Sequence, residues 1–429
     1  MRYIVFFPVV YSQFMRLLHT SDWHLGQSLH NFERHYEHQR FLDWLLDTIV
    51  AERADALLIA GDIFDNANPS SASQKQLYRF LQRAKERMPH LNLVVVGGNH
   101  DSPGRLEAPG PLLEAHGTRV IGAVQRHADG AIDLEALVLP LTGADGSVQA
   151  WCLAVPFLRP GDVPRKAADA EAETADSAAD PYLAGIALLY KQALDLALAK
   201  RQPGQAIVAM GHCHMVDGQM SADSERRIVI GGTEMLPAGI FDPAIAYAAL
   251  GHLHLAQAVG KQHHIRYCGS PIPLSFAEVG YQHQVLRIDL DGDAVREIVP
   301  IAIPRAVQLL RVPAKPALIG QVLEELAALD VPDAPTEEQP FLEVRVRLDA
   351  PEPGLRARIE AALDDKPVRL AKIETSSAAR GSVLDAEVMT LDRLEQLKPD
   401  DIFRQLYQQR FGNEAPPDQL SAFAELMLP

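Results

Sequence analysis

The chain contains, at residues 93–101, the stretch Leu-Val-Val-Val-Gly-Gly-Asn-His-Asp. Four branched apolar residues in a row predict a short buried strand, and the glycine pair predicts a sharp turn after it. That turn places an amide, an imidazole and a carboxylate at the carboxyl end of the strand. Ligands of α/β sheets gather beyond these strand ends, so the stretch predicts a functional site there.

The same arrangement recurs along the chain. The stretch at 16–19 and the apolar runs at 56–60, 206–210 and 246–250 each lead into polar groups. These groups are Ser21-Asp22-Trp23-His24, Gly61-Asp62, Gly211-His212-Cys213-His214 and Gly251-His252-Leu253-His254. Amphipathic helices are expected at 37–50, 73–88 and 183–200. Continuous apolar strands that alternate with helices predict an α/β protein whose sheet is buried on both faces.

Bulk composition sets weaker bounds. The chain has 429 residues, 47% hydrophobic and 22% charged, which is ordinary for a globular protein of two or three domains. Its three cysteines are far apart and odd in number, which favours a reducing compartment over a disulfide framework. A net charge of −16 is unfavourable for a stand-alone nucleic-acid binder, although bound divalent cations or a partner protein could supply positive charge.

Composition also suggests domain boundaries. Residues 1–14 are interpreted as a non-native extension, with translation starting at Met15; a native peptide containing Phe6 or Phe7 would refute this. Residues 15–299 form the α/β domain, interrupted by a low-complexity insertion at 165–180. Prolines near 300, Pro300 among them, are interpreted as a linker. Residues 300–388 are expected to form a small α+β domain, with helices at 322–329 and 355–363 and strands at 341–348 and 368–373. Residues 389–429 are expected to form a helical tail. No membrane-spanning segment is expected.

The polar groups are suited to binding two cations. Asp22 and His24, and likewise His252 and His254, are two residues apart, so in an extended segment each pair shares a face. Asp62 is the natural bridging carboxylate, because one carboxylate can hold two cations about 3.5–4 Å apart. Asn99 offers a carbonyl oxygen. We interpret Asp62 and Asn99 as ligands rather than as a helix cap and a turn residue.

Three histidine assignments are less direct. His100 either protonates a leaving oxygen as a general acid, with Asp101 orienting its ring, or is a loop histidine bonded to the backbone. In Gly211-His212-Cys213-His214, His212 is the chosen ligand, and Cys213 is expected to pack inward between exposed neighbours. His263, His264 and His283 are expected at the surface.

The donor set indicates the metal. Mixed carboxylate, amide and imidazole ligands suit manganese, iron or zinc, and the oxygen donors favour manganese. Two adjacent divalent cations are a common device for hydrolysing phosphate esters.

The ordered motifs resemble the calcineurin-like metallophosphoesterase superfamily. Its pattern is D-x-H, G-D, G-N-H-D/E, an isolated His and G-H-x-H, and each element is present. Residues 18–26, 60–65, 155–159 and 266–276 further resemble the bacterial SbcD family of nuclease subunits. This resemblance implies a four-layer α-β-β-α sandwich with a small α+β capping domain and a C-terminal helical tail.

The resemblance also implies roles for individual residues. One metal, expected to be Mn²⁺, would be held by Asp22, His24, Asp62 and His254. The other would be held by Asp62, Asn99, His212 and His252. His100 would be the catalytic histidine.

The substrate implied by the resemblance is DNA ends and hairpins. These would be cut by an ATP-dependent double-strand exonuclease activity and a single-strand endonuclease activity. An SbcC-type partner would hydrolyse the ATP, because this chain has no Walker A loop. Helices near 73–88 and 104–116 would form the interface of a homodimer. DNA cleavage would take place in the cytoplasm, at the nucleoid. Candidate phosphate contacts are Arg345, Arg347, Arg356, Arg358, Arg369 and Lys372. The apolar tail positions expected to dock on the partner are Ile402, Phe403, Leu406, Tyr407, Phe411, Leu420, Phe423 and Leu426.

Two other readings compete with the nuclease. A phosphatase or cyclic-nucleotide phosphodiesterase could use the same scaffold, but needs neither the extra domain nor the tail. A non-catalytic scaffold would be expected to lack ligands, and none of the pattern is missing.

Overall fold

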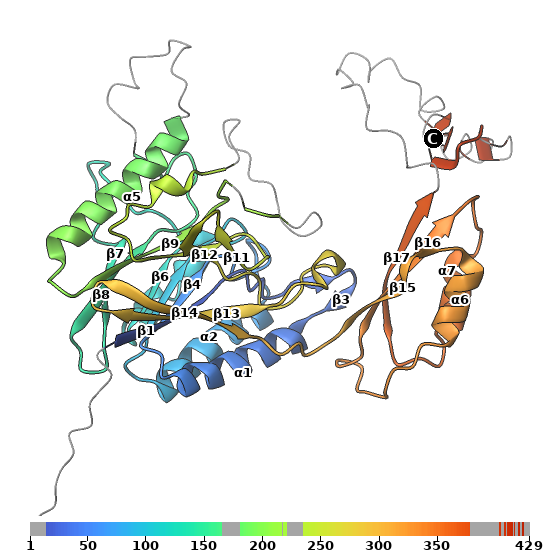
Figure 1. Cartoon of the computed structure of the whole chain (residues 1–429), viewed down its shortest axis with the longest axis horizontal. Coiled ribbons are helices and arrows are strands. Elements are labelled where there is room, and N and C mark those ends of the chain that lie inside the picture. Colours follow the sequence, from blue (N-terminus) through green and yellow to red (C-terminus); the bar gives the residue numbers. More distant parts are fainter. Residues whose placement is uncertain are drawn as a thin grey trace, which may run out of the picture. The chain divides into compact units, whose positions relative to one another are not determined.

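The computed structural model describes residues 14–164, 181–216, 218–220 and 235–377, with scattered residues between 403 and 423. The chain divides into two compact units, Met1–Ala306 and Val307–Pro429, and each is described by itself (Figure 1). The expectations for residues 1–13, for the 165–180 insertion and for a tail helix at 391–397 lie outside the described residues.

The first unit is built on two six-stranded sheets with parallel strands at their centres. The first sheet has antiparallel strands at one edge only, and the second has an antiparallel strand at each edge. The first sheet has the order β14 (Ala294–Ala302), β13 (Gln284–Asp291), β1 (Phe14–Thr20), β4 (Ala56–Ala60), β5 (Asn92–Val96) and β6 (Thr118–Ile121). The second has the order β11 (Gln257–Val259), β12 (Gln262–Tyr267), β10 (Tyr247–Gly251), β9 (Ala206–His212), β8 (Val148–Ala154) and β7 (Val138–Thr142).

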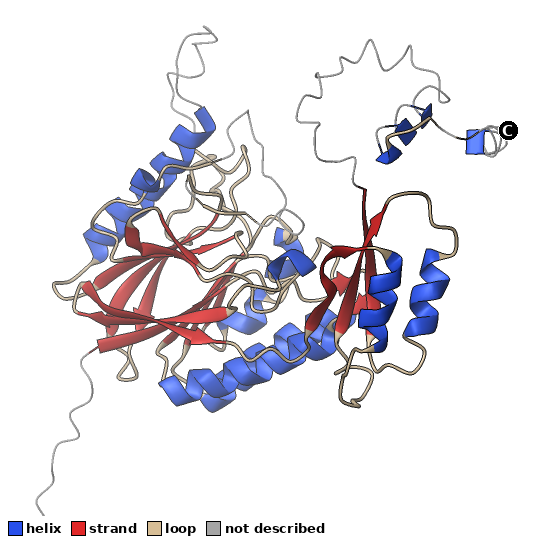
Figure 2. Cartoon of the chain, turned by 45° about the vertical axis from the view of Figure 1, so that its right-hand side comes forward, coloured by secondary structure: helices blue, strands red, loops and turns tan. Residues whose placement is uncertain are grey.

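The two sheets pack face to face, and helices cover their outer faces (Figures 1 and 2). Along β4, Leu58 belongs to the core between the sheets, whereas Leu57 and Ile59 pack with helices α1 (His35–Glu52) and α2 (Ser71–Arg87). This alternation is what an extended strand imposes on a sheet covered on both sides. The α-β-β-α order confirms the predicted four-layer sandwich.

Helix α5 (Pro181–Lys200) covers the second sheet. Among the described residues it is the one helix long and apolar enough to cross a membrane by length and composition. Its buried side, which includes Leu189 and Tyr190, belongs to the core of the second sheet, and the Tyr190 hydroxyl donates a hydrogen bond to the Met210 carbonyl (3.0 Å). Packing inside the protein therefore accounts for the apolar residues on its buried side.

A buried histidine joins the two sheets. His19 on β1 lies 3.2 Å, through Nε2, from the carbonyl of Leu250 on β10, and 2.9 Å, through Nδ1, from the hydroxyl of Tyr247. A carbonyl can only accept, so Nε2 carries the proton and Nδ1 accepts from the tyrosine. Burial lowers the pKa of His19 to about 3, so the ring is neutral.

The second unit is a three-stranded parallel sheet with two helices. Its strands have the order β15 (Leu309–Ala317), β16 (Phe341–Leu348) and β17 (Arg369–Ser377). The helices α6 (Ile319–Ala327) and α7 (Leu355–Ala362) pack through Val322 and Ile359 against apolar residues of that sheet.

The prolines near residue 300 suggested a linker, but Pro300 lies in a strand. It pairs with Leu286 inside β14, which is the edge strand of the first sheet. An edge strand tolerates proline because its outward side needs no amide donor.

The remaining described elements are short. The helix expected at 104–116 is divided into α3 (Pro103–Glu107) and α4 (Gly110–Glu114). The strands β2 (Ser28–Leu29) and β3 (Phe32–Glu33) form a small hairpin, and the 3₁₀ turns are η2 (Ala238–Ile240) and η3 (Phe276–Glu278).

Candidate metal centre

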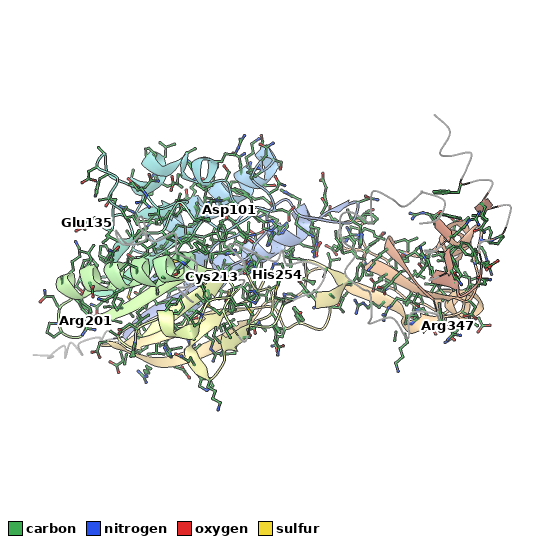
Figure 3. All side chains as sticks on the ribbon, turned by 90° about the horizontal axis from the view of Figure 1, so that it is seen from above. Asp101, Glu135, Arg201, Cys213, His254 and Arg347 are labelled. Atoms are coloured by element: carbon green, nitrogen blue, oxygen red, sulfur yellow. The ribbon has the colours of Figure 1, made fainter. Side chains whose placement is uncertain are left out.

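The predicted site residues come together at the carboxyl ends of strands from both sheets. Sheet one contributes from the loops after β1, β4 and β5, and sheet two contributes from the end of β9 and the loop after β10. Six of these residues are buried, and Asn99 and His100 are half-buried. The buried residues are Asp22, His24, Asp62, His212, His252 and His254. Asp101 and His254, labelled in Figure 3, mark two of the contributing loops.

Three overlapping groups of ligand atoms form one continuous cluster. They are Asp22 with His24 and His254, His24 with Asp62 and His100, and Asp22 with Asp62 and His212. In each group the three ligand atoms lie within 4.8 Å of one another. Asp22, His24 and Asp62 each belong to two groups, so the groups overlap, and a carboxylate such as Asp62 can bridge two cations.

The surroundings of His212 indicate a position for a cation. Its Nδ1 lies 2.9 Å from the Ala60 carbonyl and must donate there. Its Nε2 then turns toward two oxygens, Asn99 Oδ1 at 2.9 Å and Asp62 Oδ2 at 3.3 Å. Burial disfavours a charged ring, but the Asp62 carboxylate outweighs it and raises the pKa of His212 to about 9. A proton or a cation must lie among these three electron-rich atoms.

Two further imidazole nitrogens in the cluster are buried without a hydrogen-bond partner among the described residues. They are Nε2 of His24 and Nε2 of His252. Burial, followed by the neighbouring His212, lowers the pKa of His252 well below its usual value, so this ring is neutral. A buried polar nitrogen without a partner is costly, and a metal ion would satisfy it. The donor set therefore fits a pair of divalent cations.

The backbone is strained at the site. Asp22, His24, Asp62 and His252 have φ values of 54°, 46°, 49° and 105°, which place these side chains in a region that non-glycine residues avoid. The expectation that Asp22 and His24 share one face of an extended segment is therefore wrong, because their loop turns left-handed at both residues. Such strain is typical of functional sites, where the surrounding structure holds it in place.

Glycines let the loops approach one another, as predicted. A Cβ on Gly98 would lie 2.1 Å from Asp62 Oδ1 and 2.3 Å from the Asp62 amide nitrogen. A Cβ on Gly251 would lie 1.9 Å from the Ala60 carbonyl oxygen. Neither position can carry a side chain without moving the loop that holds Asp62.

His100 is oriented by Asp65 rather than by Asp101. Its Nδ1 donates to the Asp65 carbonyl oxygen (2.6 Å), and its backbone N–H donates to Asp62 Oδ1 (2.9 Å). Its ring meets the His24 ring edge-on at 4.8 Å between centroids. The predicted role of Asp101 in orienting His100 is therefore wrong.

The carboxylate of Asp101 instead joins two loops. It accepts backbone N–H groups from Ile63 (3.1 Å), Phe64 (3.0 Å) and Gly98 (2.8 Å). Burial, followed by repulsion from Asp62, raises its pKa to about 6. Asp101 thereby fixes the Asp62 loop against the loop that carries Asn99.

Two expectations for the other histidines fail. Cys213 is half-buried, whereas its neighbours His212 and His214 are buried, so the neighbours are not exposed. His283 is also buried, with Nδ1 2.7 Å from the Ser270 carbonyl, because the chain folds back over it beyond β12. His263 is exposed, and His264 is half-buried.

Two acidic residues that the sequence reasoning missed touch the cluster. Asp65 Oδ1 lies 3.5 Å from Nδ1 of His24, and Glu278 Oε1 lies 2.9 Å from Nδ1 of His254. Asp65 follows Asp62 by three residues and could have been found from that spacing. Glu278 lies 24 residues beyond His254, and no short-range motif links them.

The side chains proposed to contact DNA in the second unit form ion pairs, hydrogen bonds or ring contacts with other residues of that unit. Arg345 pairs with Glu374 (2.9 Å) and donates to the Ala314 carbonyl. The Arg369 guanidinium lies 3.8 Å from the centroid of the Phe341 ring. Arg347 lies 3.6 Å from Asp349 with 46% of its side chain exposed, which makes it the most accessible of the three. The ion pairs of the other candidates are Arg356–Glu360, Arg358–Glu352 and Lys372–Glu343.

Comparison with known proteins agrees with this geometry. A family model described as calcineurin-like phosphoesterase matches residues 15–256, and one described as type 5 capsule protein repressor C-terminal domain matches residues 305–411. The chain is 41% identical over 358 residues to the SbcD component of the SbcCD nuclease of Rhodobacter capsulatus, covering 83% of this chain and 86% of that protein.

The chain belongs to the SbcD family of calcineurin-like phosphoesterases.

A second SbcD relative, from Escherichia coli K12, is 34% identical over 395 residues, covering 91% of this chain and 92% of that protein. A dimetal phosphatase structure from Danio rerio covers 68% of this chain and 99% of that chain, at 11% identity and a TM-score of 0.33, which is too low to add to the assignment. As a member of the SbcD family, the chain is a metal-dependent hydrolase of the nuclease type, and the family uses divalent metals.

Proposed function

We propose that this protein is a manganese-dependent DNA nuclease that cuts phosphodiester bonds with two cations. The observation that carries the proposal is the convergence of His212 Nε2, Asn99 Oδ1 and Asp62 Oδ2, together with the partnerless Nε2 atoms of His24 and His252. Five loops from two sheets bring nitrogen and oxygen donors to one buried place. Such a donor set has the chemistry that Mn²⁺ accepts.

The proposed ligands divide into two sets that share Asp62. One set comprises Asp22, His24, Asp62 and His254, and the other comprises Asp62, Asn99, His212 and His252. When bound, the two cations supply the Lewis acidity that activates water and neutralises phosphate charge. The chain positions their ligands through Ala60, whose carbonyl fixes the His212 ring, and through Asp22, which accepts the His252 amide at 2.9 Å.

His100 is proposed as the general acid. Its Nδ1 proton is committed to the Asp65 carbonyl, so in the imidazolium form Nε2 carries the second proton and can give it to a leaving oxygen, which leaves the neutral Nδ1–H ring. Its half-buried position beside His24 keeps it next to the cluster while leaving substrate access. The edge contact and the backbone bond to Asp62 together restrict where the ring can point.

The proposed substrates are DNA ends and hairpins, with double-strand exonuclease and single-strand endonuclease activities. The net charge of −16 repels the phosphates of DNA, so positive charge must be supplied for binding. Bound cations and an SbcC-type ATPase would supply it. Among the described tail residues, the ring centroids of Phe403 and Phe423 lie 4.4 Å apart, and those of Tyr407 and Phe411 lie 4.8 Å apart. Tyr407 is buried, and the half-buried Phe403, Phe411 and Phe423 are the aromatic residues proposed to meet such a partner. Leu420 is half-buried, and Ile402, Leu406 and Leu426 lie outside the described residues.

The proposal further includes a homodimer built through α2, α3 and α4, acting on DNA in the cytoplasm at the nucleoid. The four-part division of the chain, with boundaries near 14, 299 and 388, stays part of this proposal. The phosphate contacts are proposed at Arg345, Arg347 and Arg369, of which Arg347 has the most exposed side chain.

The test is cleavage of hairpin DNA by the full chain with its ATPase partner in manganese. His100→Leu should retain both ions by elemental analysis and lose cleavage, whereas Asp62→Ala should lose ions and cleavage together. His263→Leu, which removes an exposed histidine outside the cluster, is the matched control and should match the wild type. Full activity of His100→Leu would reject its role. Hydrolysis of phosphate monoesters without any cleavage of DNA would reject the nuclease.

A further inference from the structure

Glu278 is a buried carboxylate that contacts one of the proposed ligands. It lies at the end of the 3₁₀ turn η3, and its side chain is 0% exposed. Its Oε1 lies 2.9 Å from Nδ1 of His254, and its Oε2 accepts the backbone N–H of Leu274 at 2.7 Å. Both oxygens are therefore used, one on the site and one on the loop that leads to η3.

These contacts favour one tautomer of His254. The Leu274 N–H can only donate, so Glu278 Oε2 accepts there and Oε1 faces the His254 ring. With Glu278 as a carboxylate, His254 donates from Nδ1, and Nε2 carries the lone pair. His254 shares a ligand-atom group with Asp22 and His24, so that lone pair is the one a metal would take.

The loop that holds Glu278 is itself held in place. The buried guanidinium of Arg34 pairs with Glu37 on α1 (2.8 Å) and donates to the Pro273 carbonyl. Gln27, in the loop after β1, donates to the Leu274 carbonyl (3.0 Å). On the other side, the Ser270 amide donates to the His254 carbonyl (3.1 Å), so the loop is fastened to the residue it orients.

We propose that Glu278 is a positioning residue for the metal centre: it holds His254 in the Nδ1–H tautomer and aims Nε2 at the ion that Asp22 and His24 bind. The inference rests on the proposed function, because it concerns the ligands of that site. A carboxylate behind a metal-binding imidazole raises its basicity and fixes its ring orientation. Glu278 thus acts on only one of the two ions, since His254 belongs to one ligand set.

The first test needs neither metal nor activity. In metal-free protein labelled with ¹⁵N-histidine, the ring nitrogens of His254 should show a protonated Nδ1 and an unprotonated Nε2. The signals are identified by their loss in His254→Asn. A proton on Nε2 in the wild-type protein would overturn the proposal, whatever happens to any variant.

The second test measures manganese binding to Glu278→Gln. Glutamine offers one acceptor oxygen and one NH2 donor where glutamate offers two acceptors. Either Leu274 loses its acceptor, or the NH2 group faces His254 and opposes the Nδ1–H tautomer. We expect one ion to bind about 10–100-fold more weakly and the other to bind as in the wild type. Glu278→Asp, which keeps two acceptors on a shorter stem, should recover part of the lost affinity. Glu343→Gln, an equally buried glutamate of the second unit, is the control and should bind both ions normally.

The outcomes separate the inference from the function it rests on. If the wild type binds two manganese ions and cuts DNA, but Glu278→Gln binds both ions with unchanged affinity, the inference is wrong and the nuclease stands. If the wild type binds no manganese, the proposed function fails first. Equal weakening of both ions in Glu278→Gln would also contradict a role confined to His254.

Discussion

The histidine that joins the two sheets should make the protein lose stability in acid. His19 is fully buried, and burial lowers its pKa from 6.5 to about 3. Below pH 6.5 the unfolded chain binds a proton at this residue, whereas the folded chain does not until about pH 3. The contribution of His19 to stability is therefore complete above pH 6.5 and is lost as the pH falls toward 3.

The size of the effect follows from the two pKa values. At pH 5 the free energy of unfolding should be lower by about 2 kcal/mol because of this residue alone, approaching about 5 kcal/mol near pH 3. The variant His19→Gln removes the titration and keeps the contacts. A glutamine amide can donate to Leu250 and accept from Tyr247, as the neutral imidazole does.

The assay is urea unfolding of the metal-free protein, followed by circular dichroism between pH 5 and pH 7.5. Other titrating groups are common to both proteins, so the difference between wild type and His19→Gln isolates this histidine. The difference should shift in favour of the variant by about 2 kcal/mol on going from pH 7.5 to pH 5. His263→Gln, at an exposed position, is the control and should leave the pH dependence unchanged. Curves for His19→Gln and wild type that run parallel to within about 0.5 kcal/mol would refute the argument.

Other substitutions test the packing around the site and its surface. Gly98→Ala puts a Cβ 2.1 Å from Asp62 Oδ1. It should lower the free energy of unfolding by about 1–3 kcal/mol and weaken manganese binding. An unchanged manganese affinity in calorimetry would contradict the close approach of the two loops. Arg34→Met leaves the Glu37 carboxylate buried without its guanidinium and should cost about 3–5 kcal/mol in urea unfolding, a loss below 1 kcal/mol being the contrary result. Leu112 lies on α4 with 74% of its surface exposed, so Leu112→Glu should change the free energy of unfolding by less than about 0.5 kcal/mol. It should nevertheless reduce self-association in sedimentation, and an unaltered dimer would exclude α4 from the dimer interface.

Much of the fold could be predicted because apolar periodicity reflects burial directly. The run at 56–60 became β4 with the same bounds because that strand is buried throughout, and residues 341–348 became β16, whose first four residues are buried. Proline misled the prediction where an edge strand tolerated it, as at Pro300. Local sequence does not show which strand lies at an edge, since that depends on the partner strand.

The candidate site was predicted as a set of residues but not as a geometry. The glycines and the order of the motifs identified which loops converge. The left-handed backbone at Asp22 and His24 and the attachment of His100 to Asp65 could not be predicted, because both depend on contacts with distant loops. Asp101 was assigned to the wrong partner for the same reason: its carboxylate accepts three backbone N–H groups, two of them from the loop after β4.

The spread of the site along the polypeptide has a consequence for biosynthesis. The first carboxylate of the cluster is residue 22, the last imidazole is residue 254, and the glutamate behind it is residue 278. A nascent chain released from the ribosome before residue 254 would carry most of the proposed donors but would lack His254. On the proposed ligand sets, metal loading would need synthesis of nearly the whole first unit, and a product truncated before residue 254 would be expected to be inactive.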